Sequence, residues 1–273
     1  NKNQRRPHVS YDSLSDYSRD LIELTRLESI EFKNIPINLN EKIQQISHAY
    51  LQIEDEYYSF ARPKSSLTSD ERTIKKLNSS GVDYIEYRAI DLNPFSRVGI
   101  DIRDIDFLEI FIIYCLLTES PKLDKNESKQ IYKNSSIISF NGREKDLKII
   151  NKDQKTHMKD WANKLLDDMY PIAEILGIDS EVLDKKKDCL THPEKTLSGK
   201  MMQILWEEDL DHDDFGQYFN KKYLEEYRLE NRRDKKNYEF IKRSAKRSHT
   251  DTLNIEKADK LDFEEYLNEY FSS

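Results

Sequence analysis

One short segment, residues 83–95 with the sequence DYIEYRAIDLNPF, constrains the fold and function of this chain more than any other. Its composition predicts a β-strand, and Pro94 ends it because proline cannot continue a sheet ladder. Successive side chains of a strand point to opposite faces, so Glu86 and Arg88 share one face while Tyr87 lies on the other. Their Cα atoms are then about 6 to 7 Å apart along the strand.

A glutamate fixed beside an arginine suits a site that binds a metal and a phosphate. Carboxylate oxygens bind hard cations, and a guanidinium matches phosphate oxygens. The same spacing also suits an ordinary ion pair on a solvated sheet face. Both interpretations of Glu86 and Arg88 stay open on spacing alone.

An upstream segment, residues 48–58, alternates in the same way, with Glu54 and Tyr58 on its polar side. We expect a second strand here, paired antiparallel with the first, so that the polar faces of both line a cleft. Arg62-Pro63-Lys64 follows, and we expect it to form a proline-stiffened turn that carries two cations at the mouth of that cleft. The alternative for this triplet is a solvated loop.

The remaining chain is expected to be mainly helical. Helical spacing of apolar residues is found at 10–27, 69–77, 105–117, 158–176, 196–206, 215–247 and 260–271. We expect Pro171 to kink or break its helix and Gly177 to end it. Asn141-Gly142, flanked by apolar residues 136–140 and 147–150, predicts a hairpin-like turn.

These patterns predict an α+β fold. An antiparallel sheet with a polar active-site face would occupy residues 1–155, and a helical C-terminal region, residues 156–273, would pack on it. The net charge of −8 argues against a main role in coating nucleic acid. The longest apolar segment, residues 107–117, is too short to span a membrane. The two cysteines, Cys115 and Cys189, are far apart in the sequence and fit a reducing cytoplasm.

Two sequence motifs resemble those of the proteobacterial-type glutamate–cysteine ligase family. Residues 51–64, LQIEDEYYSFARPK, match the pattern LQIE-x-E-x-Y-x-x-x-RPK. After a variable linker, residues 84–99 match YIE-x-R-x-x-D-x-NPFS-x-x-G. The order of the motifs is also that of the family, and the resemblance continues more weakly through the helical C-terminal part.

The resemblance implies an ATP-dependent ligase that joins the γ-carboxyl of L-glutamate to the amine of L-cysteine through a γ-glutamyl phosphate. This is the first step of glutathione biosynthesis, and the enzyme requires Mg²⁺. By resemblance, Glu86 binds Mg²⁺, Arg88 is the catalytic residue that contacts glutamate and the transferring phosphate, and Tyr58 belongs to the cysteine pocket. We further hypothesise that Arg62 and Lys64 bind the nucleotide or its phosphates. The implied sheet is of the glutamine-synthetase-like kind.

The resemblance also implies an enzyme roughly twice as long, whose other metal-binding acids lie upstream of the region that matches Asn1. We therefore expect the chain to be the C-terminal portion, to require the N-terminal half of the same enzyme as its partner, and to be inactive alone. Two alternatives are a related ligase that uses another amine, and a catalytically inactive fragment that serves as an interaction or structural module. Neither nucleic acid nor a membrane is an expected partner.

Overall fold

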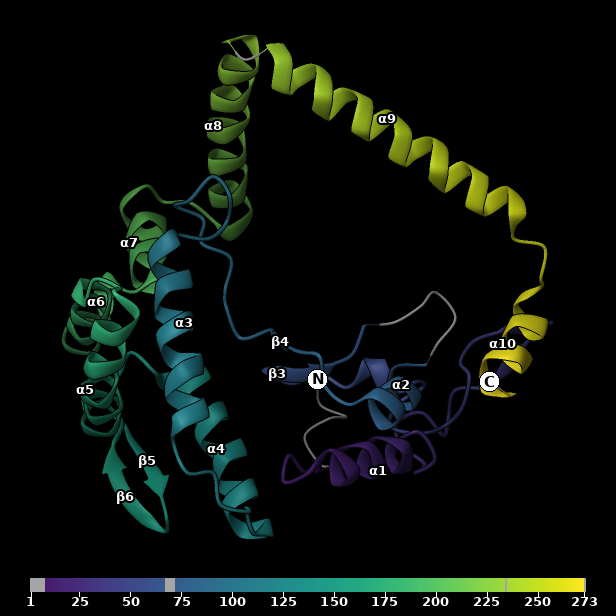
Figure 1. Cartoon of the computed structure of the whole chain (residues 1–273), viewed down its shortest axis with the longest axis horizontal. Coiled ribbons are helices and arrows are strands. Elements are labelled where there is room, and N and C mark those ends of the chain that lie inside the picture. The colour runs from purple at the N-terminus through teal and green to yellow at the C-terminus, as the bar shows by residue number, and fades with distance from the viewer. Residues whose placement is uncertain (1–7, 67–71, 234, 273) are drawn as a thin grey trace. The chain divides into compact units, whose positions relative to one another are not determined.

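The computed structural model of the chain describes residues 8–66, 72–233 and 235–272. Helices dominate these residues, together with three small two-stranded antiparallel sheets (Figure 1). The chain divides into two compact units. Unit 1 comprises Asn1–Asp91, Pro121–Leu123 and Lys260–Ser273, and unit 2 comprises Leu92–Ser120 and Asp124–Asp259. The predicted mixture of helices with antiparallel sheet is confirmed at this level.

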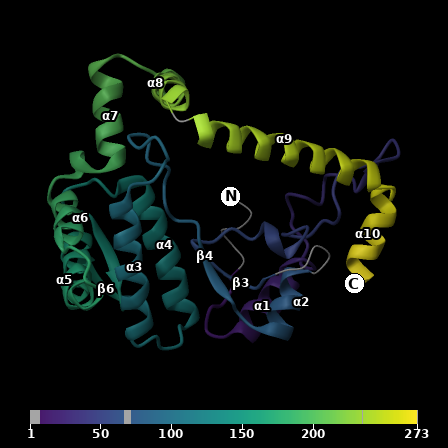
Figure 2. The ribbon, with the colours of Figure 1, turned by 45° about the horizontal axis from the view of Figure 1, so that its top comes forward.

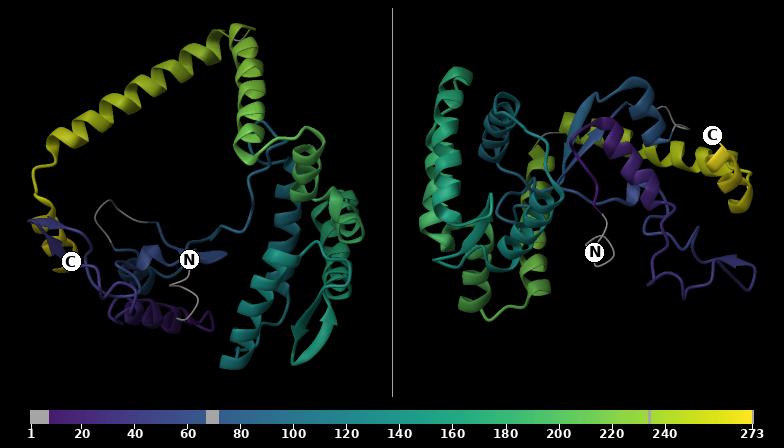
Figure 3. Two further views of the ribbon diagram at one scale, coloured as in Figure 1. Left: turned by 180° about the vertical axis from the view of Figure 1, so that it is seen from behind. Right: turned by 90° about the horizontal axis from the view of Figure 1, so that it is seen from below.

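The elements of the two units are shown from further directions in Figures 2 and 3. Unit 1 contains α1 (Leu14–Leu24), β1 (Asn38–Leu39), β2 (Lys42–Ile43), the 3₁₀ helix η2 (Glu54–Glu56), β3 (Ala61–Lys64), α2 (Thr73–Ser80), β4 (Tyr84–Tyr87) and α10 (Phe263–Ser272). Unit 2 contains α3 (Ile102–Leu117), α4 (Lys125–Asn141), β5 (Lys148–Asn151), β6 (Gln154–His157), α5 (Met158–Leu176), α6 (Glu181–Thr191), the 3₁₀ helix η3 (Pro193–Lys195), α7 (Leu197–Glu207), α8 (His212–Arg233) and α9 (Lys235–Ala258).

The core of unit 1 forms around α1. Ser13 caps this helix by accepting a hydrogen bond from the backbone N–H of Asp16, as expected for serine at an N-cap. The apolar stripe of α1 is buried against residues of α2 and of the segment that leads to β3. The buried members of this core are Val9, Tyr17, Leu21, Leu24, Leu51, Tyr57, Ile74 and Leu77.

The strand predicted near residue 84 is present as β4, and its partner is β3. The prediction of a turn at Arg62-Pro63-Lys64 is wrong, because these residues lie within β3 and pair antiparallel with β4. Pro63 is accommodated there because β3 has β4 as its single partner strand in the described residues. A proline on such an edge strand interrupts no further ladder.

The strand predicted over residues 48–58 is also wrong. Residues 54–56 form the 3₁₀ helix η2, and the residues before it form a loop. The side chain of Gln52 accepts hydrogen bonds from the backbone N–H groups of Ile46 and Ser47, at 2.5 and 2.9 Å. The carboxylate of Glu56 accepts one from the N–H of Gln52 at 2.6 Å. Such local side chain–backbone bonds replace the ladder bonds that a strand would need.

The core of unit 2 lies where α3, α5 and α6 pack together (Figure 2). Its fully buried residues include Ile110, Ala173 and Leu183. The predicted break at Pro171 does not occur, since α5 continues through this residue to Leu176. Gly177 ends α5 as predicted, in the left-handed conformation with φ of 67° that glycine adopts at low cost.

The hairpin predicted around Asn141-Gly142 is wrong in position. Asp124 and Glu127 form a capping box that starts α4, and this helix includes residues 136–140. The hairpin instead joins β5 to β6. Its two turn residues, Lys152 and Asp153, have positive φ values of 46° and 65°, which is the backbone of a two-residue hairpin turn.

The predicted division at residue 155 falls inside unit 2, so it does not coincide with the compact units, and as a description of the catalytic domain it stays a prediction. Helix α6 was not expected from the sequence. The helical pattern over residues 215–247 predicts one segment, but its described residues belong to two helices, α8 and α9. Figure 3 shows α9 as one long continuous helix. Within the described ranges, no helix combines the length and apolar character needed to cross a bilayer.

The core of unit 2 yields a test with a matched control on the same helix. Ile110 is fully buried in α3, whereas Ile112 is 39% exposed. We expect Ile110→Ala to destabilise unit 2 by about 2 to 5 kcal/mol, because it removes buried methylene groups and leaves a cavity. Ile112→Ala should have a much smaller effect. Urea unfolding followed by the fluorescence of Trp161 and Trp206, both in unit 2, measures the difference. Equal losses for the two variants would contradict this description of the core.

Candidate functional site

The pairing of β3 with β4 brings the predicted site residues together. Arg62 lies opposite Glu86, and Lys64 lies opposite Tyr84. Residues that are directly opposite in an antiparallel pair share a face, so these four side chains project from one side of the sheet. The backbone N–H of Arg88 donates to the carbonyl of Phe60 at 2.8 Å, which extends the pairing by one residue beyond β4.

Glu86 and Arg88 form an ion pair on this face. Arg88 Nη2 donates to Glu86 Oε1 at 3.1 Å. Arg88 Nε lies 3.1 Å from Glu86 Oε2, but this second approach lacks hydrogen-bond geometry, so the buried Oε2 atom accepts no hydrogen bond. Both side chains are about one-third exposed, at 34% for Glu86 and 33% for Arg88. The pair is therefore preformed and open to a ligand.

The electrostatic effect of this pair acts in both directions. The hydrogen bond from Arg88 holds the pKa of Glu86 below its usual value, and the nearby charges of Lys64 and Arg62 act in the same sense. The hydrogen bond to Glu86 in turn raises the pKa of Arg88. Glu86 is therefore an anion and Arg88 a cation at neutral pH.

Tyr58, predicted for an amine-substrate pocket, lies beside this pair. Its hydroxyl donates to the backbone carbonyl of Arg88 at 3.3 Å, and 56% of the residue is exposed. The hydroxyl thus lies close to the main chain at Arg88, while the ring remains accessible.

The two predicted phosphate ligands of β3 already have internal partners. Arg62 is 5% exposed and donates to the carbonyl of Asp55 at 2.9 Å and to that of Tyr57. Lys64 Nζ donates to Asp55 Oδ1 at 3.2 Å. These contacts hold η2 against β3. A phosphate would reach Lys64 only in competition with Asp55, and Arg62 only if its carbonyl contacts opened.

The sequence analysis missed a cluster of charged and aromatic residues behind η2. Both carboxylate oxygens of Asp55 accept from Thr73 Oγ1, at 3.0 and 2.8 Å. Glu54 is buried and pairs with Arg72. The guanidinium carbon of Arg72 lies 5.4 Å from the ring centre of Tyr270 and 5.7 Å from that of Phe271, both on α10. The acidic run at residues 54–56 was the available signal, but a strand was expected over residues 48–58 where these three residues form a 3₁₀ helix.

A magnesium ion fits Glu86 as one ligand of a larger set. The Oε2 atom is a hard, anionic oxygen without a hydrogen-bond donor, which is the donor chemistry that Mg²⁺ prefers. Among the described residues, no three His, Cys, Asp or Glu side chains lie close enough together to hold a metal ion. The chemistry of Glu86 therefore suits a site that it shares with other groups.

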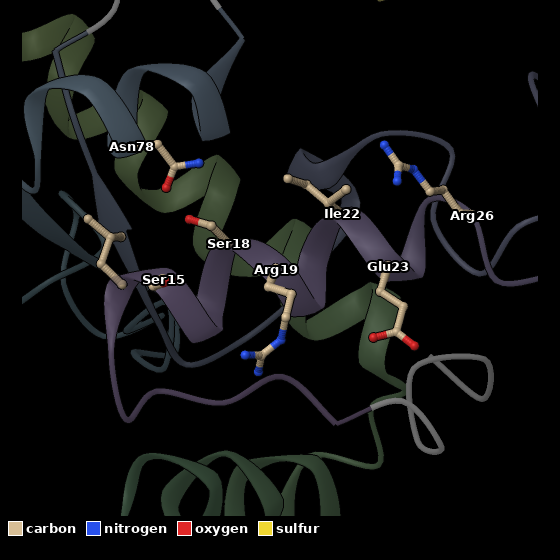
Figure 4. Close-up of a pocket in the computed structure, with 8 residues that line it drawn as sticks. Ser15, Ser18, Arg19, Ile22, Glu23, Arg26 and Asn78 are labelled. Carbon is tan, nitrogen blue, oxygen red and sulfur yellow. The ribbon is translucent and has the colours of Figure 1, made fainter.

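A separate groove on unit 1 contains none of the predicted site residues. It has a volume of about 720 Å³ and lies along α1, with Asn78 of α2 on one side (Figure 4). Arg19, on its wall, is paired with Asp16 at 2.6 Å and with Asp20 at 2.9 Å. The groove therefore offers less reactive chemistry than the face that carries Glu86.

Comparison with known proteins identifies similar sequences. A sequence model described as glutamate-cysteine ligase matches residues 1–138. The glutamate–cysteine ligase of Shewanella amazonensis is 34% identical over 227 residues, which cover 82% of this chain and 43% of the relative. That of Alcanivorax borkumensis is 32% identical over 276 residues, which cover 96% of this chain and 52% of the relative.

Two solved structures resemble the chain. The glutamate–cysteine ligase of Francisella tularensis, crystallised in complex with AMP, matches with a TM-score of 0.87 and 26% identity over 99% of this chain and 54% of that one. A bifunctional glutathione synthetase from Pasteurella multocida matches with a TM-score of 0.54 and 18% identity over 81% of this chain and 25% of that one, a likeness of fold alone. The chain spans about half the length of the curated relatives that it matches.

The Glu86–Arg88 pair predicts a defined pH response. In Arg88→Gln we expect the pKa of Glu86 to rise toward its ordinary value of about 4.3, because the hydrogen bond and positive charge that lower it are removed. A carboxyl whose pKa is lowered by folding adds stability above its unfolded pKa and loses it as the pH falls through the folded pKa. The stabilisation from this pair should therefore disappear in acid, below about pH 4.

NMR titration of the Glu86 carboxyl carbon measures this shift. Arg103→Gln is a matched control, because Arg103 pairs with Asp101 at the same two-residue spacing, with a distance of 2.9 Å. That variant should raise the pKa of Asp101 and leave Glu86 unchanged. A Glu86 titration that is identical with and without Arg88 would refute the assigned interaction.

Proposed function

The chain belongs to the glutamate–cysteine ligase family, and from this we propose that it supplies part of the active site that joins L-glutamate to L-cysteine with ATP. The product is γ-glutamylcysteine, the first intermediate of glutathione biosynthesis. The observation that carries the proposal is the Glu86–Arg88 pair, held on an accessible face of the β3–β4 sheet. Both residues fall on the family motif that the sequence displays.

The proposed reaction has two steps. The γ-carboxylate of glutamate attacks the terminal phosphate of ATP, which forms γ-glutamyl phosphate and releases ADP. The amine of cysteine then attacks the acyl carbon, phosphate leaves with the electron pair of the broken C–O bond, and the amine loses a proton. Negative charge accumulates on the transferring phosphoryl group, so a positioned cation beside it lowers the barrier.

We assign that role to Arg88. Its guanidinium stays ionised at all relevant pH values, and Glu86 orients it through the hydrogen bond at 3.1 Å. Arg88 is thereby held for bidentate contact with the glutamate carboxylate or the phosphate oxygens. Because the glutamate carboxylate and ATP are both anions, this positioned charge also brings them together against their mutual repulsion.

Glu86 is proposed as a magnesium ligand through Oε2. When bound, the ion would neutralise phosphate charge and hold the phosphates in line for transfer. Because Arg88 donates its hydrogen bond to Oε1, Glu86 would hold the ion through Oε2 and still orient the guanidinium. The remaining ligands are proposed to come from the N-terminal half of the enzyme.

Tyr58 is proposed to line the cysteine subsite. Its exposed ring offers an apolar wall, and its hydroxyl lies next to the main chain of Arg88. The amine of cysteine would then approach the acyl phosphate while Arg88 holds the phosphate group. A related ligase that accepts another amine would differ first at this wall.

ATP is the proposed nucleotide, and the AMP complex of the Francisella relative supports nucleotide binding by this chain. Lys64 is the better candidate for phosphate contact, because its side chain is 16% exposed and its ammonium has one carboxylate partner. Arg62 is buried against backbone carbonyls, which favours a role in holding η2 and β3 together. We retain phosphate binding by both as the hypothesis to be tested.

Two further proposals concern the whole enzyme. The β3–β4 pair is proposed to be part of a larger sheet of the glutamine-synthetase-like kind, whose other strands come from the N-terminal half. The ligation is proposed to require that half and to take place in the cytoplasm. The chain alone would then bind substrates weakly and release no phosphate.

Fusion of the chain to the N-terminal half of a relative tests the proposed function. We expect no glutamate- and cysteine-dependent phosphate release from ATP with the chain alone, and turnover when the N-terminal half of a relative is fused upstream. In the fused protein, Glu86→Gln and Arg88→Gln should each lower kcat by at least about 100-fold, because each removes charge stabilisation from the transition state. Continuous measurement of phosphate release checks both outcomes.

Arg103→Gln in the same fused protein is the matched control, because it removes an arginine of equal spacing outside the site. It should leave kcat within about twofold, as expected for a surface pair. Phosphate release by the chain alone would contradict the proposed need for the N-terminal half. A folded fusion without turnover would instead favour the inactive interaction module.

A second comparison in the fused protein distinguishes the role of Lys64 from that of Arg62. We expect Lys64→Gln to raise the KM for ATP by about tenfold, the cost of a lost charge-assisted contact. We expect Arg62→Gln to lower the unfolding temperature, because carbonyls of the η2 turn lose their donors. Calorimetry together with the KM measurement distinguishes the two effects, and an unchanged KM in both variants would refute their phosphate role.

A further inference from the structure

A large cavity in unit 2 lies apart from the residues discussed above. It has a volume of about 1010 Å³, at the upper end of the range for small-molecule sites. Its walls come from the turn between α4 and β5, the start of α5, the C-terminal end of α6, and α7, a region visible in Figure 2. All of these residues follow residue 138, where the match to the family model ends.

Three cations line this cavity: Arg143, Lys145 and Lys159. Within the part of the chain that the structure describes, none of their side chains forms an ion pair or hydrogen bond. The two carboxylates on the same wall are already engaged. Glu144 accepts from Asn141 at 2.5 Å, and Glu194 lies 3.3 Å from His192 Nδ1. Three cations and two carboxylates leave the lining with a net charge of +1, in a chain whose net charge is −8.

The cavity also offers an apolar floor and an aromatic ring. Leu147 is 9% exposed and lies at its base, together with Leu190 of α6. Trp206 of α7 lines the cavity and is 75% exposed, so its indole face is available to a ligand. A buried tryptophan would be explained by packing, but an exposed one on the wall of a cavity that also carries cations suits recognition of a flat anionic molecule.

Covalent capture is not the chemistry of this cavity. Cys189 also lines it, but desolvation raises the pKa of its thiol despite nearby lysines. The nucleophilic thiolate is therefore scarce at neutral pH. Reversible binding through charge and stacking is what the lining supports.

We propose that this cavity binds a nucleoside monophosphate, with its phosphate among Arg143, Lys145 and Lys159 and its base against Trp206. Three cations match a phosphate dianion better than a single carboxylate, and an indole face stacks on a planar base. The proposal does not depend on the proposed ligase function, since it uses none of the residues assigned to ligation. It identifies unit 2 as a ligand-binding unit separate from the β3–β4 face.

Tryptophan fluorescence of the full chain tests the proposal. The chain has two tryptophans, so Trp161→Phe leaves Trp206 as the single reporter. In that background, AMP should quench the fluorescence saturably, and adenosine, which lacks the phosphate, should bind at least about tenfold more weakly. Replacement of Arg143, Lys145 and Lys159 by glutamine should weaken AMP binding by at least about tenfold and remove its preference over adenosine.

A control variant replaces Lys148, Lys152 and Lys155 by glutamine, an equal change of charge on the β5–β6 hairpin outside the cavity. It should bind AMP as the parent does. The proposal would be overturned if AMP at concentrations up to about 10 mM caused no saturable quenching, because a dissociation constant above this value does not indicate a specific site. Equal binding of AMP and adenosine, or unchanged binding in the cavity variant, would overturn it as well.

Discussion

The pairing of Arg62 with Glu86 across β3 and β4 determines which side chains share the candidate site. A shift of one residue in an antiparallel pair would move every side chain to the opposite face and separate Glu86 from the cations of β3. Arg62 also joins β3 to the carbonyls of the η2 turn, which fixes the position of β3 relative to η2. The site thus depends on a buried cation that itself faces away from solvent.

Much of this site could be predicted from the sequence, because strand alternation alone placed Glu86 beside Arg88. The helices α1, α3 and α5 likewise follow from apolar spacing and, for α5, from Gly177. The same alternation failed over residues 48–58, where Gln52 and Glu56 bond to nearby backbone N–H groups instead of standing out from a strand. Periodicity describes where side chains would point, but it does not reveal which backbone groups they satisfy.

Two other features could not be predicted from the sequence, and the physical reason differs between them. The β5–β6 turn uses Lys152 and Asp153 in the left-handed region, and a sequence search favours the commoner Asn-Gly pair found elsewhere in the chain. The contact of Arg72 with Tyr270 and Phe271 joins residues that are distant in the sequence. No local pattern encodes such a contact, because it depends on the tertiary fold of unit 1.

That contact has a consequence for the order in which the chain folds during synthesis. The core of unit 2, made by α3, α5 and α6, is complete once residue 191 has left the ribosome. Unit 1 begins earlier in the sequence but includes α10, so the contact of Arg72 with Tyr270 and Phe271 forms only after that helix has been made. The core of unit 2 is therefore free to form before the contacts of unit 1 with α10, because α10 follows the whole of that core in the sequence.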